Sequence, residues 1–169
     1  MVRKCKDLSD VERAYFHKDN ISMDAPWSVV NNCVMLNNVL HRTPPSTQHQ
    51  TFVAPTNVEI IGSYAFQCNK GTIYLPNVKR ISADAFFKTT SIIYAPNVEV
   101  VEDNAFVGDG FCGNVFLFAP RLQKLSPKAF YHCEGFVFVG QNTNLHSNPK
   151  MHLTTSLEVW NSLINPIPA

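Results

Sequence analysis

One stretch of twelve residues decides the fold, and it reads Ala95-Pro96-Asn97-Val98-Glu99-Val100-Val101-Glu102-Asp103-Asn104-Ala105-Phe106. The same order of an early proline, spaced aliphatic residues and a closing Ala-Phe pair returns at 54–66, 75–86 and 119–130. The closing phenylalanines follow one another after 20, 20 and 24 residues. A unit of this size cannot bury its own apolar side, whereas stacked units can. The repeat therefore predicts a solenoid whose units contact their neighbours.

A short run of β-branched and aromatic residues precedes the proline of each copy, and such runs are typical of strands. Proline ends each strand because it has no N–H group for the ladder. Stacking of equivalent runs predicts a parallel sheet with rungs about 4.8 Å apart. After each turn, the stretch that leads into the Ala-Phe pair is expected to form a brief helical turn on the opposite side. The five predicted strands are 51–54, 72–75, 92–95, 116–119 and 136–139, the last of which ends at Gly140.

The unit Ile-x-x-x-Ala-Phe followed by Ile-x-x-Pro-x-Val resembles the BspA-type leucine-rich repeat over about residues 51–140. Cys133, three places after Phe130, matches the cysteine of that family's unit. The resemblance implies an α/β solenoid, that is, a leucine-rich-repeat-like parallel sheet of about five rungs with short helical turns and terminal caps. It also implies a curved module that binds other macromolecules, often at the surface of bacteria or protists.

The extent of the repeat divides the chain into an N-terminal cap at 1–50, a solenoid at 51–140 and a C-terminal cap at 141–169. Solenoids need caps to hide their terminal cores. In the first cap, a Ser-Asp-Val-Glu capping box predicts a helix over about 8–18, and 34–36 is a candidate leading strand.

The C-terminal cap is expected to contain a closing helix at 153–164. Leu157, Trp160 and Ile164 fall on one side of it, so it is a candidate cover for the last exposed rung.

Alternate residues of a strand point to opposite sides, so the residues one and three places before each proline are expected inside. All of them are aliphatic, aromatic or small. Two further inward ladders are predicted from the repeat, with the closing phenylalanines as a structural stack. The first consists of Val58/Ile61, Val78/Ile81, Val98/Val101 and Leu122/Leu125, and the second of Phe66, Phe86, Phe106 and Phe130.

The positions that should face outward are apolar too, although an exposed sheet face normally carries polar residues. We call the residues two places before each proline the main row: Val53, Tyr74, Tyr94, Phe118 and Phe138. Those four places before form the side row: Thr51, Thr72, Ile92, Phe116 and Phe136. Together they are the aromatic face, about 19 Å long over four rung spacings. Its candidate partner-binding residues are Tyr74, Tyr94, Phe116, Phe118, Phe136 and Phe138.

A monomer rarely exposes a large contiguous apolar patch without reason, and two readings of the aromatic face are open. Another part of the chain or a second copy covers it, or it docks on another protein through aromatic anchors. The second reading predicts a non-catalytic protein–protein interaction module, an adaptor or an inhibitor that docks through this face. The alternatives are a surface adhesin or host-binding module, a self-association unit, and a small hydrolase.

Composition narrows the class of partner. The 169 residues carry a formal net charge of +1 and only 16% charged residues, which argues against a nucleic-acid binder. No secretory signal begins the chain and no run of 18 apolar residues occurs, so neither export nor membrane insertion is expected. These features predict a cytoplasmic protein if the chain is complete, and an extracellular one if a signal was removed.

Signals for catalysis are weak. The five cysteines are odd in number and lack C-x-x-C pairs, which argues against a disulfide framework or a zinc site, and no cofactor is expected. The hydrolase alternative rests on the loop at 108–114, which lengthens the last step of the repeat from 20 to 24 residues, and on a pairing of Cys112 with His132 across neighbouring repeats.

Overall fold

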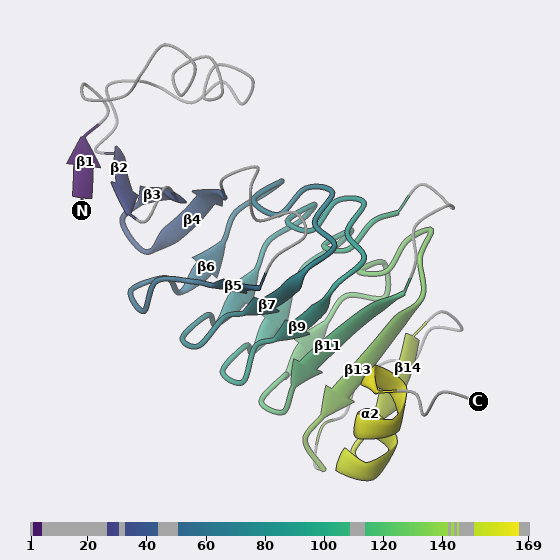
Figure 1. Cartoon of the computed structure of the whole chain (residues 1–169). Helices are drawn as coiled ribbons and strands as arrows, with labels where there is room; N and C mark the ends of the chain where they lie inside the picture. Colours follow the sequence, from purple (N-terminus) through teal and green to yellow (C-terminus); the bar gives the residue numbers. More distant parts are fainter. Residues whose placement is uncertain are drawn as a thin grey trace.

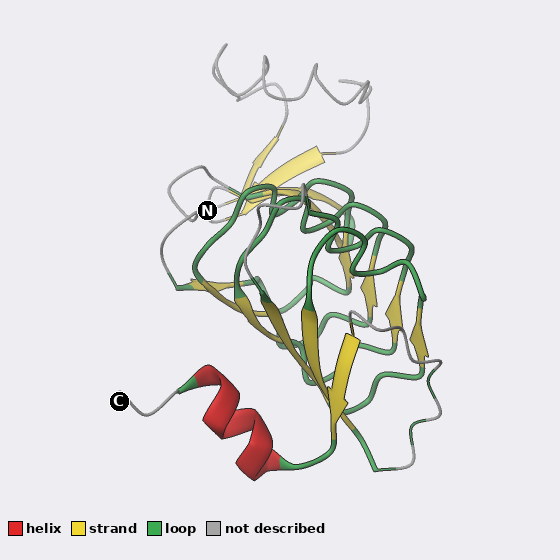
Figure 2. Ribbon diagram, turned by 90° about the vertical axis from the view of Figure 1, so that its right-hand side faces the viewer, coloured by secondary structure: helices red, strands yellow, loops and turns green. Residues whose placement is uncertain are grey.

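The computed structural model describes residues 2–4, 27–30, 33–43, 51–108, 114–141, 143, 145 and 151–165. The predicted helix at 8–18 and most of the insertion, residues 109–113, lie outside the described residues. Within the described part, the chain winds as a β-solenoid of about five turns that carries two sheets on opposite sides (Figures 1 and 2).

The first sheet, which we call the aromatic sheet, contains all five predicted strands. Neighbouring strands are parallel and in register, so that Phe118 lies opposite Tyr94 on one side and Phe138 on the other. A sixth strand, β14, continues the sheet beyond β13 and occupies residues that include the expected start of the closing helix. The strands are β5 (Phe52–Val53), β7 (Thr72–Tyr74), β9 (Ile92–Tyr94), β11 (Val115–Ala119), β13 (Gly135–Val139) and β14 (Met151–Thr154).

The second sheet, which we call the charged sheet, takes the side where the helical turns were expected. Its parallel part holds β4 (Val39–Arg42), β6 (Ile60–Ile61), β8 (Arg80–Ile81), β10 (Val100–Val101) and β12 (Lys124–Leu125). An antiparallel extension adds β1 (Val2–Lys4), β2 (Trp27–Val30) and β3 (Cys33–Leu36). The predicted strand at 34–36 is thus confirmed, in this second sheet.

The expected α/β, leucine-rich-repeat-like architecture is wrong, because the stretch around each Ala-Phe pair forms a chain of tight turns. In the first copy, Ala65 N–H donates to Gly62 O within the coil, while Tyr64 and Phe66 N–H donate to carbonyls of the next coil. Residues in the left-handed region make this alternation possible, among them Tyr64 (φ 60°) and Cys68 (φ 58°). An α-helix would keep those N–H groups within one coil. The turns therefore form a third hydrogen-bonded stack.

The interior agrees with the predicted ladders. Every residue expected to face inward from the five strands and from the first additional ladder is buried. The closing phenylalanines stack ring on ring, with centroids 4.9 Å apart between Phe66 and Phe86, 5.2 Å between Phe86 and Phe106, and 4.8 Å between Phe106 and Phe130. The continuous core runs from coil to coil without a break.

Buried polar groups tie the coils together at the end of each turn. Thr89 Oγ1 donates to Phe66 O at 2.7 Å, and Ser91 Oγ lies 3.0 Å from Asn69 Oδ1. Cys133 Sγ donates to Phe106 O at the equivalent place two coils further on. Since a buried carbonyl without a donor is costly, these side chains stabilise the end of each turn.

One helix is present among the described residues, α2 (Leu157–Ile164). Ser156 caps its N-terminus by accepting a hydrogen bond from Val159 N–H, and Trp160 is its buried side chain. The predicted closing helix is confirmed, although it begins later than expected. It lies against the outer side of the aromatic sheet near β13 and β14 (Figures 1 and 2).

Candidate interaction surface

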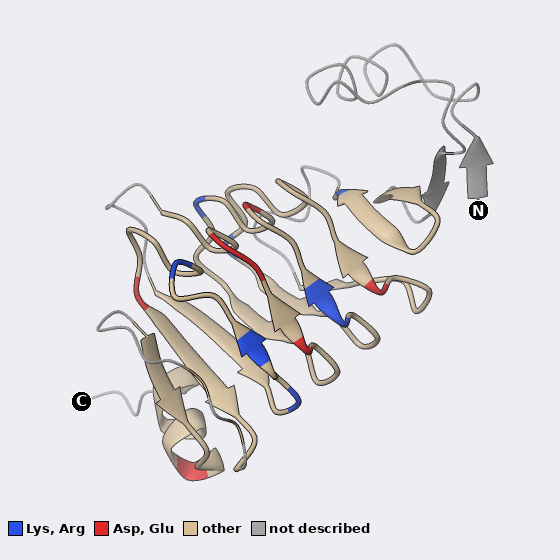
Figure 3. Ribbon diagram, turned by 180° about the vertical axis from the view of Figure 1, so that it is seen from behind, with Lys and Arg blue, Asp and Glu red and all other residues tan. Residues whose placement is uncertain are grey.

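The two sheets present different chemistry to solvent. Charged residues of both signs lie along the charged sheet (Figure 3). They pair between neighbouring coils, since Lys79 Nζ lies 3.0 Å from Glu59 Oε1 and Arg80 Nη1 lies 3.1 Å from Glu102 Oε1. Because these charged side chains pair within the chain and stay at least partly exposed, this side of the solenoid is polar and solvated. The aromatic sheet carries the unusual surface.

The main row forms a second column of rings outside the core. Register places its residues on successive strands, so Tyr74 and Tyr94 stack at 4.9 Å with 8° between their planes, and Phe118 and Phe138 stack at 4.7 Å with 11°. Tyr94 and Phe118 are tilted by 46° at 6.0 Å and connect the two pairs. Aromatic pairs at such separations stabilise each other by more than the burial of their surface area alone, and this attraction keeps the column ordered.

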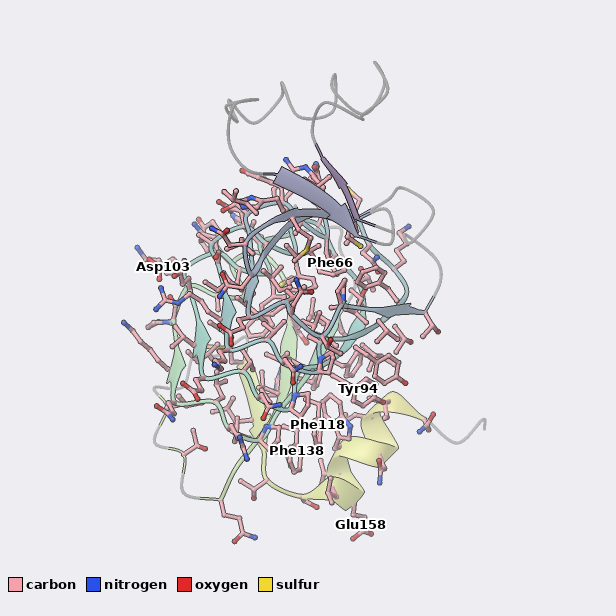
Figure 4. The ribbon with its side chains drawn as sticks, turned by 90° about the vertical axis from the view of Figure 1, so that its left-hand side faces the viewer. Phe66, Tyr94, Asp103, Phe118, Phe138 and Glu158 are labelled. Atoms are coloured by element: carbon pink, nitrogen blue, oxygen red, sulfur yellow. The ribbon has the colours of Figure 1, made fainter. Side chains whose placement is uncertain are left out.

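Helix α2 covers the later half of this column. The ring of Trp160, only 2% exposed, lies 5.8 Å from Phe118, 6.3 Å from Phe138 and 6.4 Å from Tyr94. Figure 4 shows Tyr94, Phe118 and Phe138 on the side of the helix that faces the sheet, whereas Glu158 lies at the end of the helix away from Tyr94. The reading in which the chain covers its own aromatic face is therefore correct for these rungs.

The earlier half of the column is open. Val53 is 62% exposed and Tyr74 is 40% exposed. They border an open depression of about 520 Å³ with an almost wholly apolar lining. The lining residues are Val53, Tyr74, Leu75, Pro76, Tyr94, Pro96 and Phe118. Large apolar residues left exposed together in this way are typical of interaction sites.

The side row ends in its own ring stack. Phe116 and Phe136 stack at 5.1 Å, and His152 of the unpredicted strand β14 stacks on Phe136 at 4.6 Å. His152 Nε2 also lies 3.6 Å from Glu134 Oε2. Nearer β7, a smaller depression of about 330 Å³ lies beside Phe116, and its lining includes Thr72 and Lys70. Polar groups thus border the side row, in contrast to the main row.

The six residues predicted as a partner site share one face but differ in exposure. Tyr74 is exposed, Tyr94, Phe116, Phe118 and Phe136 are half-buried, and Phe138 is buried. The prediction left Val53 out of the six, although it is the most exposed large apolar residue of the described part. The closing helix was expected as a cover, which the contacts of Trp160 confirm, whereas the contact of His152 was not anticipated because β14 lies outside the repeat. Whether any of these residues binds a partner stays a prediction.

Burial shifts the ionisation of one side chain on the aromatic face and of one cysteine in the core. It raises the pKa of the Tyr94 hydroxyl, and the neighbouring Tyr74 acts in the same direction. It raises the pKa of the Cys33 thiol to about 12, so this cysteine stays protonated and chemically inert at neutral pH.

The described residues do not test the hydrolase alternative. Cys112 lies outside the described residues, and the exposed His132 ring contacts Tyr131, with centroids 4.0 Å apart. The described residues also contain no group of three side chains placed to hold a metal ion.

Among the helices of the described ranges, none has both the length and the apolar composition to cross a membrane. Comparisons with known protein families, with curated proteins and with solved structures find no match to this chain. The BspA-type resemblance therefore has no support beyond the β-solenoid architecture itself.

Proposed function

We propose that the chain is a non-catalytic interaction module, an adaptor or an inhibitor, that docks on another protein through the aromatic face. One observation carries the proposal: the main row is an ordered apolar column whose earlier half, at Val53 and Tyr74, is left exposed. Leaving this apolar surface in water costs free energy that a bound partner would recover. Aromatic side chains on a rigid support are favoured anchors because little conformational entropy is lost when they are buried.

The contrast between the two sheets supports this choice of face. Exposed pairs such as Glu59 with Lys79 are already satisfied within the chain and contribute little to binding. The depression at Val53 and Tyr74 has no covering segment among the described residues, and its support is a sheet paired strand by strand. Such a preorganised site loses little entropy on association.

Site-specific photocrosslinking tests the proposal. A photoreactive phenylalanine analogue replaces Tyr74 in the whole chain, expressed in the cells that naturally make it, and a matched variant carries the analogue at Lys124 on the charged sheet. We expect a discrete crosslinked protein at position 74 that is absent at position 124. Crosslinks at position 124 alone, or no crosslinked protein at position 74, would show that the aromatic face does not dock.

A further inference from the structure

Helix α2 shows how this face accepts a protein segment. The helix contributes one large anchor, Trp160, to rings from three successive strands, β9, β11 and β13. Among its other residues, Glu158 and Ser162 are exposed and polar, and Leu157 and Val159 are exposed and apolar. The face thus accepts one short helix with one aromatic anchor. The main row continues beyond this helix at the same rung spacing through Tyr94 and Tyr74 to Val53.

On the face of the sheet at Tyr74, the open half offers side chains but no backbone hydrogen bonds, whereas β5, which carries Val53, is the last strand of this sheet among the described residues. The open half lies on the face of the sheet, where the backbone groups of β7 are engaged with β5 and β9 on either side. A segment that lies on this face must therefore satisfy its own N–H and C=O groups, and a helix does so internally. Helix α2 has this property, since Trp160 N–H donates to Ser156 O and Asn165 N–H to Asn161 O. An extended segment laid on this face would lack such partners.

Ring orientation favours an edge-to-face contact with an inserted aromatic side chain. Tyr74 and Tyr94 stack one face of each ring on the other, with 8° between the planes and centroids 4.9 Å apart, and Tyr94 also packs against Phe118. An aromatic edge attracts the face of an inserted ring. Trp160 meets Tyr94 in this way, with 81° between the planes.

The chemistry of the lining excludes charge from the contact side of the occupant. The depression is bordered by Val53, Pro76 and Pro96 besides the tyrosines, and burial of an unpaired charge there would be costly. The depression is shallow and open to solvent, so a bulky ring can reach its apolar lining.

From these observations, and resting on the docking role above, we propose that the open half of the main row binds an amphipathic helix of a partner protein. The helix lies on the face next to α2, with an uncharged contact side and one aromatic anchor in the depression at Val53 and Tyr74. The main row thus has two binding positions for helices, and the chain's own helix α2 occupies one of them.

A constrained peptide of the chain's own helix is a suitable probe, since this helix already packs on the aromatic face. It spans residues 155–165, with Ser162→Lys joined to Glu158 by a lactam bridge on the exposed side, because an isolated helix of this length is marginal in water. Its binding to the full chain is measured by fluorescence anisotropy. The matched control peptide carries Trp160→Ala.

We expect the labelled peptide to bind the full chain, and to bind about tenfold or more weakly when the chain carries Val53→Ser with Tyr74→Ser. Lys79→Ser on the charged sheet should leave the affinity unchanged, and the Trp160→Ala peptide should bind about tenfold or more weakly. Circular dichroism confirms that each variant is folded. Equal binding by the two peptides, or equal binding to wild type and to the Val53→Ser/Tyr74→Ser chain, would overturn the proposal.

The identity of the occupant separates this proposal from the docking role itself. If a partner crosslinks at position 74 through a helical segment with an aromatic residue, both proposals stand. If it crosslinks there through an extended or a polar segment, the helix proposal fails and the docking role survives. If wild-type chain alone forms a dimer in sedimentation and Tyr74→Ser abolishes it, the occupant is a second copy, and the proposal of a separate partner is overturned.

Discussion

At the scale of single residues, backbone conformation decides how the repeat folds. Tyr64, Asp84 and Asn104 each lie two places before a closing phenylalanine, and all three adopt a positive φ between 56° and 60°. Asparagine and aspartate tolerate this region, but tyrosine rarely does. The dihedral angles of these residues direct N–H groups to the next coil. Residue types alone did not show this, which is why a helical turn was predicted there.

Gly135 is a position where close approach demands glycine. A Cβ atom at this residue would lie 2.4 Å from the ring carbons of Phe130, which ends the phenylalanine stack. Gly135→Ala should therefore lower the free energy of unfolding by about 1–3 kcal/mol, measured by chemical denaturation. The loss in the free energy of unfolding should be smaller in a Phe130→Leu background, because the smaller side chain makes room for the methyl group. An undiminished loss in that background would show that the ring contact is not its cause.

The pair Glu59 and Lys79 is expected to respond to pH. Hydrogen bonds from Lys79 and then Asn38 lower the pKa of Glu59, and the hydrogen bond to Glu59 raises the pKa of Lys79. The contribution of Glu59 to stability is thus present above its unfolded pKa and lost as the pH falls through the lowered folded value. That of Lys79 is present below its unfolded pKa and lost as the pH rises through the raised folded value.

Lys79→Gln tests this pair. It should move the pKa of Glu59 back toward its ordinary value, as followed by an NMR titration of the carboxyl group. Stability near neutral pH should change little, because both groups are exposed. An unchanged Glu59 pKa would mean that the ion pair does not form in solution.

At the scale of elements, the period of the repeat and its proline placement were enough to predict five of the six strands of the aromatic sheet. Alternation before each proline predicted the inward residues, because burial on one side of a strand follows directly from its geometry. Strands β6, β8, β10 and β12 were not predicted, since each contains two residues, too few for a period to be recognised. Strand β14 was missed because it lies outside the repeat.

Helix α2 depends on one side chain for its place on the sheet. Trp160 is buried, whereas Leu157 and Val159 are 56% and 46% exposed. Trp160→Ala should release the helix, because eight residues cannot hold a helix alone and loss of a buried tryptophan costs about 3–5 kcal/mol. Hydrogen–deuterium exchange should then show nearly complete loss of protection at 157–164 with the solenoid still protected.

Val159→Ala is the matched control for this experiment, since it removes an exposed side chain from the same helix. Protection of α2 should stay close to wild type in that variant. If Trp160→Ala also leaves the helix protected, other contacts hold it on the aromatic sheet.

At the scale of the whole molecule, the repeat predicted a solenoid correctly but could not distinguish a helical second side from a second sheet. Both architectures place an aliphatic ladder and an Ala-Phe pair inside, so the apolar pattern is the same for each. The aromatic face was found because outward positions such as Tyr74 should have been polar. Its division into a covered and an open half depends on Trp160, more than forty residues from Phe118, and no local pattern encodes that contact.

The two sheets give the molecule two chemically different surfaces. One sheet pairs its charges from coil to coil, and the other stacks its rings and leaves Val53 and Tyr74 uncovered. If the aromatic face docks, a single exposed ring on it should matter far more than a single exposed charge on the opposite sheet, even though neither residue supports the core.

The most direct test compares the affinity of the partner captured at position 74 for two chains that differ from wild type by one exposed side chain each. Tyr74→Ser removes a ring from the open half of the main row, and Lys124→Ser removes a charge from the charged sheet. We predict that Tyr74→Ser weakens binding about tenfold or more, as expected for a central aromatic anchor, and that Lys124→Ser changes it less than about twofold. Unchanged affinity for the folded Tyr74→Ser chain would contradict the claim that the aromatic face is the docking surface.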